Sequence, residues 1–346
     1  MRLLQFSLLF FILLLVQSCP KKSSTEIKEP TKPNIIAPPK LGFSVVGYFP
    51  SYRTVKEYDD VFFKRCTIIN YAFSNVNTAG TLDAVNQLKF DSVYNKAKAN
   101  GAKVFMSVVG ADNFKAMATT AVGRNNFIKS VLQKVRQYKL DGVDIDWEYP
   151  KTSDGSDISF AALMKELSDS LHVDGKYYLS AAITPGKYAG SIRDGIKNEV
   201  FNYTDFFNVM IYDDFNTTVP YKHHSDMSFY DLCLNYWINT RGMPKEKFIA
   251  GIPLYGRPSG ITQSGTVLSY KTILALGGNP VSDSAVVSAG GFNNYTIYYN
   301  GQNTVKNKAI KAQQNANGIM FWEIGQDDPG TNSLIKAACD AIGRVY

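Results

Sequence analysis

Cysteine and histidine are scarce in this sequence, which has four of the first and three of the second in 346 residues. None of the cysteines stands in a Cys-x-x-Cys or Cys/His spacing typical of zinc sites. His223 and His224 are adjacent, so their side chains point in different directions, and no third ligand accompanies them. We therefore expect no metal and loop or rim contacts for the histidine pair. Three cysteines are expected to be buried free thiols, namely Cys66, Cys233 and Cys339.

Motifs for nucleic-acid binding are also lacking. The formal net charge is +7 and the isoelectric point about 9.0, but Lys and Arg are dispersed along the chain and form no cluster. A dispersed basic surface favours, at most, attraction to anionic envelopes. We expect no nucleic-acid partner.

A long hydrophobic run is missing as well. The N-terminal apolar stretch, residues 8–16, is shorter than the roughly 20 residues that a membrane-spanning helix needs. It follows a basic start, Met1-Arg2, and precedes Ser18-Cys19, which is the arrangement of a secretory signal. Because a cysteine directly follows the small residue, the segment resembles a bacterial lipoprotein signal, with Cys19 as the lipidated first residue of the mature chain. An ordinary signal peptide with a chance cysteine, or an uncleaved membrane anchor, are the alternatives.

The next segment, Pro20–Lys40, is rich in Lys, Pro, Ser and Thr. Such a composition is typical of a disordered, extended tether. We expect residues 1–18 to be a signal peptide and residues 19–40 a tether that holds a folded domain in the cell envelope, facing the periplasm or the cell surface. Contact with the membrane would be through the lipid anchor only.

Residues 41–346 are enough for one large domain with its own core, since 45% of the chain is hydrophobic and 13% aromatic. Nothing in the sequence indicates an oligomer, so a monomer is the default expectation. Short apolar runs alternate with helix-like segments throughout this part, which is the pattern of a parallel α/β fold. Eight runs are expected to be strands, at residues 44–48, 67–73, 103–108, 142–147, 178–183, 207–212, 248–254 and 318–322. Apolar residues at three-to-four spacing predict helices at residues 91–99, 124–138, 159–171, 230–240 and 307–314.

Eight strands separated by helices predict a closed barrel with its active site at the C-terminal ends of the strands. One interval, about residues 258–301, interrupts the alternation with Gly, Ser, Asn and Tyr. Strand-like pieces stand at residues 266–268 and 295–299. We expect a short insertion between the seventh and eighth strands.

Three acids stand two residues apart at Asp144, Asp146 and Glu148, within and directly after the fourth predicted strand, with apolar residues between them. A strand sends alternate side chains to opposite faces, so the acids would form a row about 6.6 Å apart. Mutual repulsion would raise at least one pKa and keep a carboxylic acid protonated near neutral pH. Glu148, nearest the strand end, is the expected proton donor. The pattern does not favour a calcium loop, because an EF-hand needs a Gly at its sixth and a Glu at its twelfth position, and Trp147 and Pro150 interrupt the segment.

This segment resembles the signature of family-18 glycoside hydrolases, the chitinases and their relatives, whose pattern is Asp-x-x-Asp-x-Asp-x-Glu on the fourth strand of a (β/α)8 TIM barrel. Asp141, Asp144, Asp146 and Glu148 occupy all four acidic positions. Other motifs recur in order, as Met210-Ile-Tyr212-Asp213, Gly251-Ile-Pro-Leu-Tyr255-Gly-Arg257 and Gly318-Ile-Met-Phe-Trp322. The resemblance covers the chain from Leu41 to its end.

The resemblance implies a retaining, substrate-assisted mechanism without a cofactor. Glu148 would protonate the glycosidic oxygen, and Asp146 would hold the N–H of the substrate's 2-acetamido group. Asp144 would pair with Asp146 and share a proton, Tyr212 would donate to the acetamido oxygen, and Asp141 would be structural. The resemblance also implies a set of substrate-binding residues, with Trp322 as the apolar floor: Tyr48, Phe73, Met210, Asp213, Tyr255, Arg257 and Trp322.

One position departs from the family pattern. The third strand of the family usually ends Ser-x-Gly-Gly, whereas this chain has Ser107-Val-Val109-Gly110. A Val in place of Gly adds bulk beside the acids of the fourth strand. We expect it to narrow the space beneath the sugar or to shift Asp144 relative to Asp146 without abolishing activity.

Three functions remain open at this point. A chitinase acting on β-1,4-linked N-acetylglucosamine polymers or oligomers is favoured by Trp147 and Pro150, which chitinases typically carry after the acids. An endo-β-N-acetylglucosaminidase acting on N-glycans often has a second acid in place of the Trp. A catalytically weak glycan-binding lipoprotein would usually have lost the residue corresponding to Glu148 or Asp146, and both are present. The expected partner is therefore chitin or an oligosaccharide that contains N-acetylglucosamine.

Overall fold

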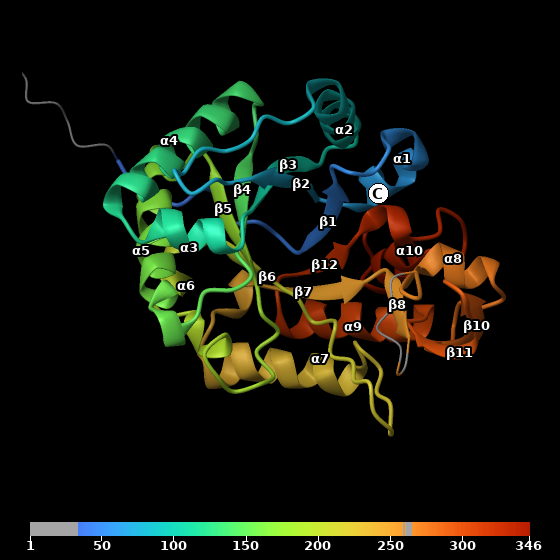
Figure 1. The fold of residues 1–346 in the computed structure, drawn as a ribbon. Coiled ribbons are helices and arrows are strands. Elements are labelled where there is room, and N and C mark those ends of the chain that lie inside the picture. The colour runs from blue at the N-terminus through green and yellow to red at the C-terminus, as the bar shows by residue number, and fades with distance from the viewer. Residues whose placement is uncertain (1–33, 259, 261–264) are drawn as a thin grey trace, which may run out of the picture. The chain divides into compact units, whose positions relative to one another are not determined.

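The described part of the chain folds around a closed barrel of eight parallel strands (Figure 1). In the computed structural model, residues 34–258, 260 and 265–346 are described. The barrel order is β1-β12-β7-β6-β5-β4-β3-β2. The strands are β1 (Ser44–Pro50), β2 (Ile68–Asn75), β3 (Lys103–Val109), β4 (Gly142–Asp146), β5 (Tyr178–Ile183), β6 (Phe206–Val209), β7 (Phe248–Pro253) and β12 (Gly318–Trp322). The predicted TIM barrel is confirmed.

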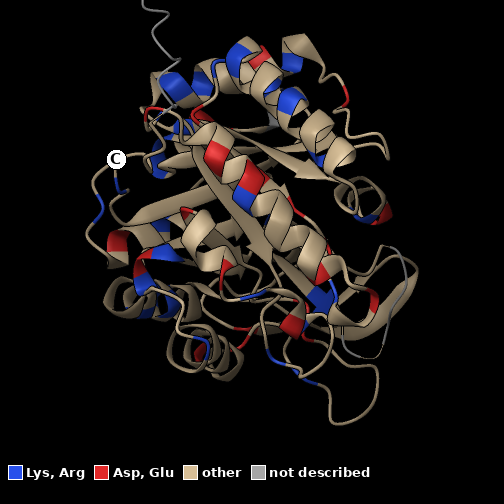
Figure 2. Cartoon of the chain, turned by 90° about the vertical axis from the view of Figure 1, so that its left-hand side faces the viewer, with Lys and Arg blue, Asp and Glu red and all other residues tan. Residues whose placement is uncertain are grey.

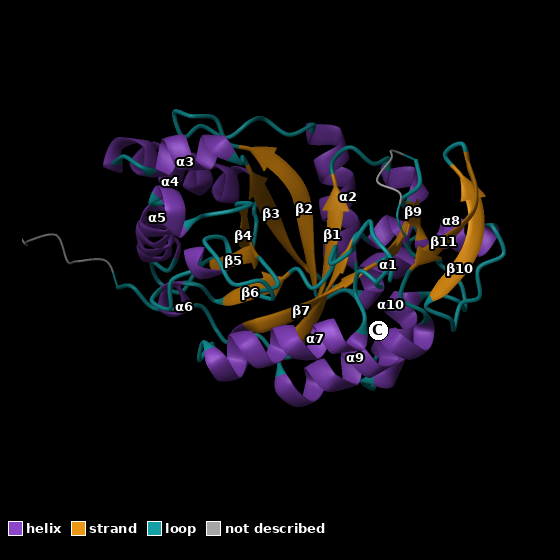
Figure 3. Cartoon of the chain, turned by 60° about the horizontal axis from the view of Figure 1, so that its bottom comes forward, coloured by secondary structure: helices purple, strands orange, loops and turns teal. Residues whose placement is uncertain are grey.

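Helices surround the barrel, and Figure 3 shows them outside the ring of strands. They are α1 (Asp60–Arg65), α2 (Gln87–Ala99), α3 (Asp112–Ala118), α4 (Ala121–Gln137), α5 (Ser156–Leu171), α6 (Val200–Tyr203), α7 (Met227–Leu234), α9 (Gln302–Asn315) and α10 (Leu334–Ala341). The helix α4 shows how the sequence specifies them: Thr120 caps its N-terminus by accepting a hydrogen bond from the Gly123 N–H. Its apolar stripe, Phe127, Val131 and Val135, is buried against the barrel.

Two apolar layers follow from the alternation of side chains along the strands. On β1, Val46 and Tyr48 point into the barrel, while Val45 and Phe49 point outward to the helices. Both faces are covered, so β1 and β4 are buried along their whole length. All three described cysteines are buried free thiols, as predicted. Lys and Arg are interspersed with Asp and Glu over the helices in Figure 2.

The insertion between β7 and β12 is a small α+β unit beside the barrel (Figures 1 and 3). It has a four-stranded sheet in the order β10-β11-β8-β9. Its elements are β8 (Tyr255–Pro258), β9 (Leu268–Ser269), α8 (Tyr270–Ala275), β10 (Ser284–Ala289) and β11 (Phe292–Tyr298). The sequence predicted two strand-like pieces here but neither α8 nor β10, because their short apolar runs are weakly periodic. The sheet also begins before residue 258, at Tyr255.

Three expected boundaries are corrected by the structure. The strand β4 ends at Asp146 instead of residue 147, and β6 ends at Val209 instead of residue 212, so Tyr212 as well as Glu148 lies beyond the end of its strand. The tether was expected to reach Lys40, but residues 34–40 already pack on the domain. The Ile36 N–H donates to the His172 carbonyl at 3.1 Å, and the Tyr178 hydroxyl donates to the Pro39 carbonyl at 2.8 Å.

Residues 1–33, which include Cys19 and the expected signal peptide, lie outside the described residues. Among the described helices, none has the length and apolar character that crossing a membrane requires.

Candidate active site

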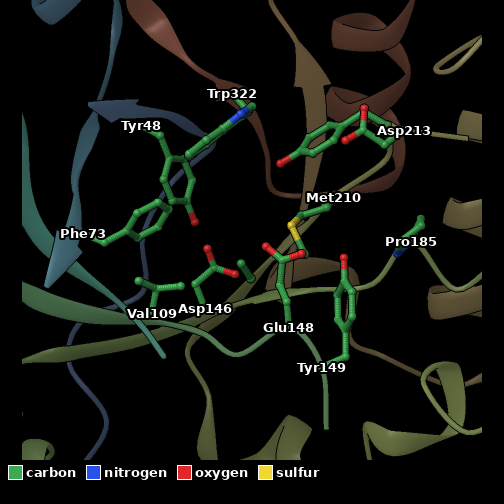
Figure 4. Close-up of a pocket in the computed structure, with 12 residues that line it drawn as sticks. Tyr48, Phe73, Val109, Asp146, Glu148, Tyr149, Pro185, Met210, Asp213 and Trp322 are labelled. Atoms are coloured by element: carbon green, nitrogen blue, oxygen red, sulfur yellow. The ribbon is translucent and has the colours of Figure 1, made fainter. Parts of the chain in front are cut away.

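A cavity of about 240 Å³ opens at the C-terminal ends of the barrel strands. Figure 4 shows Asp146 and Glu148 pointing into it, with Tyr48, Phe73 and Trp322 along one side. Its lining consists of Tyr48, Phe73, Val109, Asp146, Glu148, Tyr149, Ala182, Pro185, Met210, Tyr212, Asp213 and Trp322. Eight predicted site residues are thus brought together from strand ends that are far apart in the sequence.

Asp144 lies beneath the cavity, fully buried inside the barrel. Tyr48 and Ser107 donate hydrogen bonds to one carboxylate oxygen at 2.7 and 2.8 Å. Ser180 and the Asn208 amide donate to the other at 2.6 and 3.1 Å. Burial raises the pKa of Asp144, and these four hydrogen bonds offset part of that rise.

The expected proton-sharing pair of Asp144 and Asp146 is not found in the described part of the chain, where four donors hold Asp144 instead. The Asp146 Oδ1 oxygen is buried there without a hydrogen-bond partner. Burial raises the pKa of Asp146 well above its usual value, and the charges of Glu148 and Asp144 add to the rise. A buried acceptor that lacks a donor is costly, so this oxygen is prepared to accept a hydrogen bond from a ligand.

Glu148 follows β4 by two residues and is the exposed member of the acidic row. Partial burial raises the pKa of its carboxyl, a hydrogen bond from the Tyr149 hydroxyl lowers it, and the nearby charge of Asp213 raises it again. A raised pKa keeps the carboxyl protonated closer to neutral pH, which suits a general acid. The predicted donor therefore stands where a substrate can reach it.

The aromatic residues form a continuous apolar side of the cavity. The Trp322 ring stacks on Phe73, with centroids 5.7 Å apart, and meets Tyr48 edge-on at 5.5 Å. Tyr212 also lines the cavity, and its hydroxyl lies 4.0 Å from the Met320 sulfur. Burial is the main cause that raises the pKa of Tyr212 well above its usual value, so its hydroxyl stays protonated and can donate. Rings of this kind offer flat apolar faces to a sugar.

Asp213 is held by three groups at the rim. Arg257 binds both carboxylate oxygens, at 2.8 Å for its Nη2 atom, and the Tyr255 hydroxyl donates at 2.6 Å. Burial opposes ionisation of Asp213, but Arg257, His224 and Tyr255 outweigh it and hold the pKa below its usual range. Tyr255 and Arg257 were predicted to bind substrate. They lie outside the cavity lining and contact Asp213.

Trp147 and the two adjacent histidines, which the sequence analysis singled out, do not line the cavity. Trp147 is buried between the rings of Phe114 and Phe160, outside the barrel, and does not reach the cavity. His223 and His224 lie in the loop after β6, where His223 bonds to the Tyr299 carbonyl and His224 is buried. No cluster of ligands suited to a metal is found among the described residues. Sequence reasoning missed Tyr149, Ala182 and Pro185 in the lining. Tyr149 directly follows Glu148, and Pro185 follows the end of β5. Residues at these strand ends are expected to line the site of a barrel.

Asp213 gives a first prediction, because its charge raises the pKa of Glu148. Glu148 must be protonated to act as an acid, so activity is lost as pH rises through its pKa. In Asp213→Asn this charge is gone and the pKa of Glu148 falls, so the alkaline limb of kcat/KM should move to lower pH. The measurement is a pH profile of kcat/KM. In the control Asp214→Asn, whose carboxylate binds Lys187 and Lys222, the limb should stay in place. If the alkaline limb of kcat/KM stayed in place in both variants, the charge of Asp213 would not be raising the pKa of Glu148.

Val109 gives a second prediction. It is in register with Asp146, and its side chain lines the cavity, whereas a side chain at Gly110 would meet Val76 at 2.4 Å. Position 110 therefore requires Gly, and position 109 does not. In Val109→Gly, the cavity gains room beside Asp146, so kcat should be unchanged or higher, with a stability loss of about 0.5–1 kcal/mol from backbone freedom. Steady-state kinetics and thermal unfolding test this. A sharp fall in kcat would show that Val109 is an adapted part of the cavity.

A parallel barrel with paired carboxylates and an aromatic wall at its C-terminal strand ends defines a glycoside hydrolase of the TIM-barrel class. Comparison with known families agrees: the model for glycosyl hydrolases family 18 matches residues 44–327. The chain belongs to this family.

Individual relatives are distant. Endochitinase 1 of Metarhizium robertsii is 26% identical over 295 residues, which is 72% of this chain and 68% of that protein. Probable chitinase 10 of Drosophila melanogaster is also 26% identical, over 69% of this chain but only 12% of the much longer fly protein. Among solved structures, the chitinase ChiB of Flavobacterium johnsoniae is 26% identical, with a TM-score of 0.71 over 88% of this chain and 94% of that one.

Proposed function

We propose that the protein is a chitinase that hydrolyses β-1,4-linked N-acetylglucosamine chains with retention of configuration. The observation that carries the proposal is the pairing of the exposed Glu148 carboxyl with the unpartnered buried oxygen of Asp146. One group can deliver a proton, and the other can accept a hydrogen bond from an amide N–H. The names of the relatives support the same substrate class.

The reaction would use the substrate's own acetamido group as the nucleophile. Glu148 donates its proton to the glycosidic oxygen as that bond breaks, and the acetamido oxygen attacks the anomeric carbon, giving an oxazolinium ion. Asp146 holds the acetamido N–H, where positive charge develops, and Tyr212 donates to the acetamido oxygen. Glu148, now a carboxylate, takes a proton from the water that opens the ring. Trp322 supplies the apolar floor.

The substrate of this reaction is tested with N-acetylglucosamine oligomers and, in parallel, an N-glycopeptide, using the full chain. Mass spectrometry of the products separates the substrates and shows whether cleavage is internal or terminal. Cleavage of the oligomers is the expected result. Cleavage of the glycopeptide alone would move the function to N-glycan release. Binding of the oligomers without cleavage would leave a glycan-binding protein. Trp147 cannot decide between these by contact, because it lies outside the cavity.

We also propose that the protein is exported as a lipoprotein anchored at Cys19. The support is the sequence around Cys19 and the path of the chain. Residues 36 and 39 bind next to the start of β5, so the chain enters the folded domain at the end of the barrel opposite the cavity. Intact-mass analysis of the mature protein tests this: a lipid-modified N-terminal Cys19 is expected, and an unmodified N-terminus would refute it.

A further inference from the structure

The loop that follows β6 carries Tyr212 and Asp213, and its backbone is unusual. Asp213 has a φ of 65°, in the left-handed region that an L residue other than Asn or Asp seldom adopts. The Asp213 and Asp214 N–H groups bond within the loop, to the His224 ring at 3.4 Å and the His224 carbonyl at 3.0 Å. These contacts shape the loop but do not attach it to the rest of the domain.

A buried lysine adds a further attachment to those that Arg257 and Tyr255 make to Asp213. Lys308 on α9 is completely buried, and its ammonium donates to the Asn300 Oδ1 atom and the Ser225 carbonyl, both at 2.6 Å. It also donates to the Ser225 hydroxyl at 2.9 Å. That hydroxyl in turn donates to the Ile211 carbonyl at 2.5 Å. Ile211 stands between two residues of the cavity lining, so the ammonium is separated from the site by one hydroxyl and one peptide group.

No carboxylate within the described residues forms an ion pair with this ammonium, which is uncommon for a fully buried lysine. Its neighbours come from three parts of the chain: the Tyr230 ring and Cys233 on α7, Asp226 with the two histidines that precede it, and Asp283 before β10. Burial lowers the pKa of Lys308 to about 7, while Asp283, Asp226 and Cys233 raise it in part. Burial also lowers the pKa of His223 to about 4 and that of His224, so both rings are neutral where Lys308 titrates.

We propose that Lys308 is a positioning residue, whose ammonium fixes Ser225 and the Ile211 backbone so that Tyr212 and Asp213 keep their places at the cavity. A buried cation without a counter-ion is costly, and its three acceptors are all backbone or neutral side-chain oxygens of the loop and of the end of the insertion. The ammonium has three N–H donors for these three acceptors. The neutral amine has only two N–H donors, and its hydrogen bonds are weaker because they are no longer assisted by a charge. The attachment therefore weakens as pH rises through neutrality.

The test compares the full chain with Lys308→Met and with Lys311→Met, a control on the same helix whose ammonium pairs with Asp231 at the surface. The proposal rests on the proposed hydrolysis for its kinetic readout. Below pH 6, Lys308→Met should lower kcat by about tenfold or more, because small displacements of reacting groups cost that much. The ratio of wild-type to variant kcat should fall toward one above pH 8, where wild-type Lys308 has lost its proton. Loss of the Glu148 proton affects both proteins and cancels in the ratio. A ratio that is constant with pH, or equal kcat values, would overturn the proposal.

A second variant and a second readout keep the test decisive if Lys308→Met does not fold. Asn300→Asp places a carboxylate beside Lys308, which stabilises the ammonium and raises its pKa. The pH at which the loop after β6 loosens should therefore move upward. Hydrogen exchange of the peptide amides in residues 206–225, corrected for intrinsic rates, follows the loop without turnover. Exchange in the wild type should quicken above pH 7, and the onset should shift upward in Asn300→Asp. If the wild type cleaves no oligomer, the hydrolysis proposal fails alone. Exchange that is independent of pH in both proteins would overturn the positioning role.

Discussion

Replacing Glu148 by Gln is expected to lower kcat by about 10²–10⁴, the contribution of general acid catalysis. The amide keeps the size of the side chain but has no proton to deliver to the leaving oxygen. The aromatic wall of Trp322, Phe73 and Tyr48 is unchanged by this substitution, since none of these rings contacts Glu148 through a hydrogen bond in the described part of the chain. Oligosaccharide affinity should therefore be retained.

The measurement pairs steady-state kinetics with calorimetric binding of an N-acetylglucosamine oligomer. Glu199→Gln is a matched control, because that residue is exposed at the start of α6 and its carboxylate makes no capping hydrogen bond. It should leave both kcat and affinity unchanged. If Glu148→Gln lost affinity as strongly as turnover, Glu148 would be shaping the site and not supplying a proton.

Replacing Asp146 by Asn is the second large effect, with an expected fall in kcat of about 10²–10³, as for loss of one group that stabilises charge in the transition state. Asp146 has one buried oxygen without a partner. In the proposed mechanism, this carboxylate faces the charge that develops on the acetamido group. Asn preserves the shape and removes the negative charge. Because the charge of Glu148 is one cause of the raised pKa of Asp146, the two acids titrate together, and the pH profile of the variant should also change.

Kinetics with oligomers and product stereochemistry by NMR test this prediction. Asp169→Asn removes an exposed ion pair with Lys165 and should leave kcat unchanged. A kcat close to that of the wild type in Asp146→Asn would mean that the acetamido group is not the nucleophile that Asp146 supports.

The acidic row shows how far strand periodicity carries a prediction. Alternation correctly placed Asp144 and Asp146 inside the barrel, because a strand that is covered on both faces has only two directions for its side chains. It could not show that β4 ends at Asp146, since strand ends depend on pairing with the neighbouring strands. The partners of Asp144 could not be predicted either. They come from β1, β3, β5 and β6, which only closure of the barrel brings together.

The insertion and the segment before β1 were less predictable for a related reason. Short strands such as β10 gain their stability from a neighbour and not from their own composition, and residues 34–40 resemble a tether until contacts with Tyr178 and His172 hold them. The role of Lys308 was equally hidden, because a lysine on an amphipathic helix normally faces solvent.

The sequence by itself determined the number and order of the barrel strands, the family and the identity of the acids, because these follow from local periodicity and from motifs of adjacent residues. Only the tertiary structure decided which groups stabilise Asp144, which oxygen of Asp146 lacks a donor, and how Arg257, Tyr255 and Lys308 hold the loop after β6. Those properties depend on distances between residues up to about 160 positions apart. Burial and hydrogen bonding at such distances arise when the chain closes into a barrel, and no pattern within a single segment encodes them.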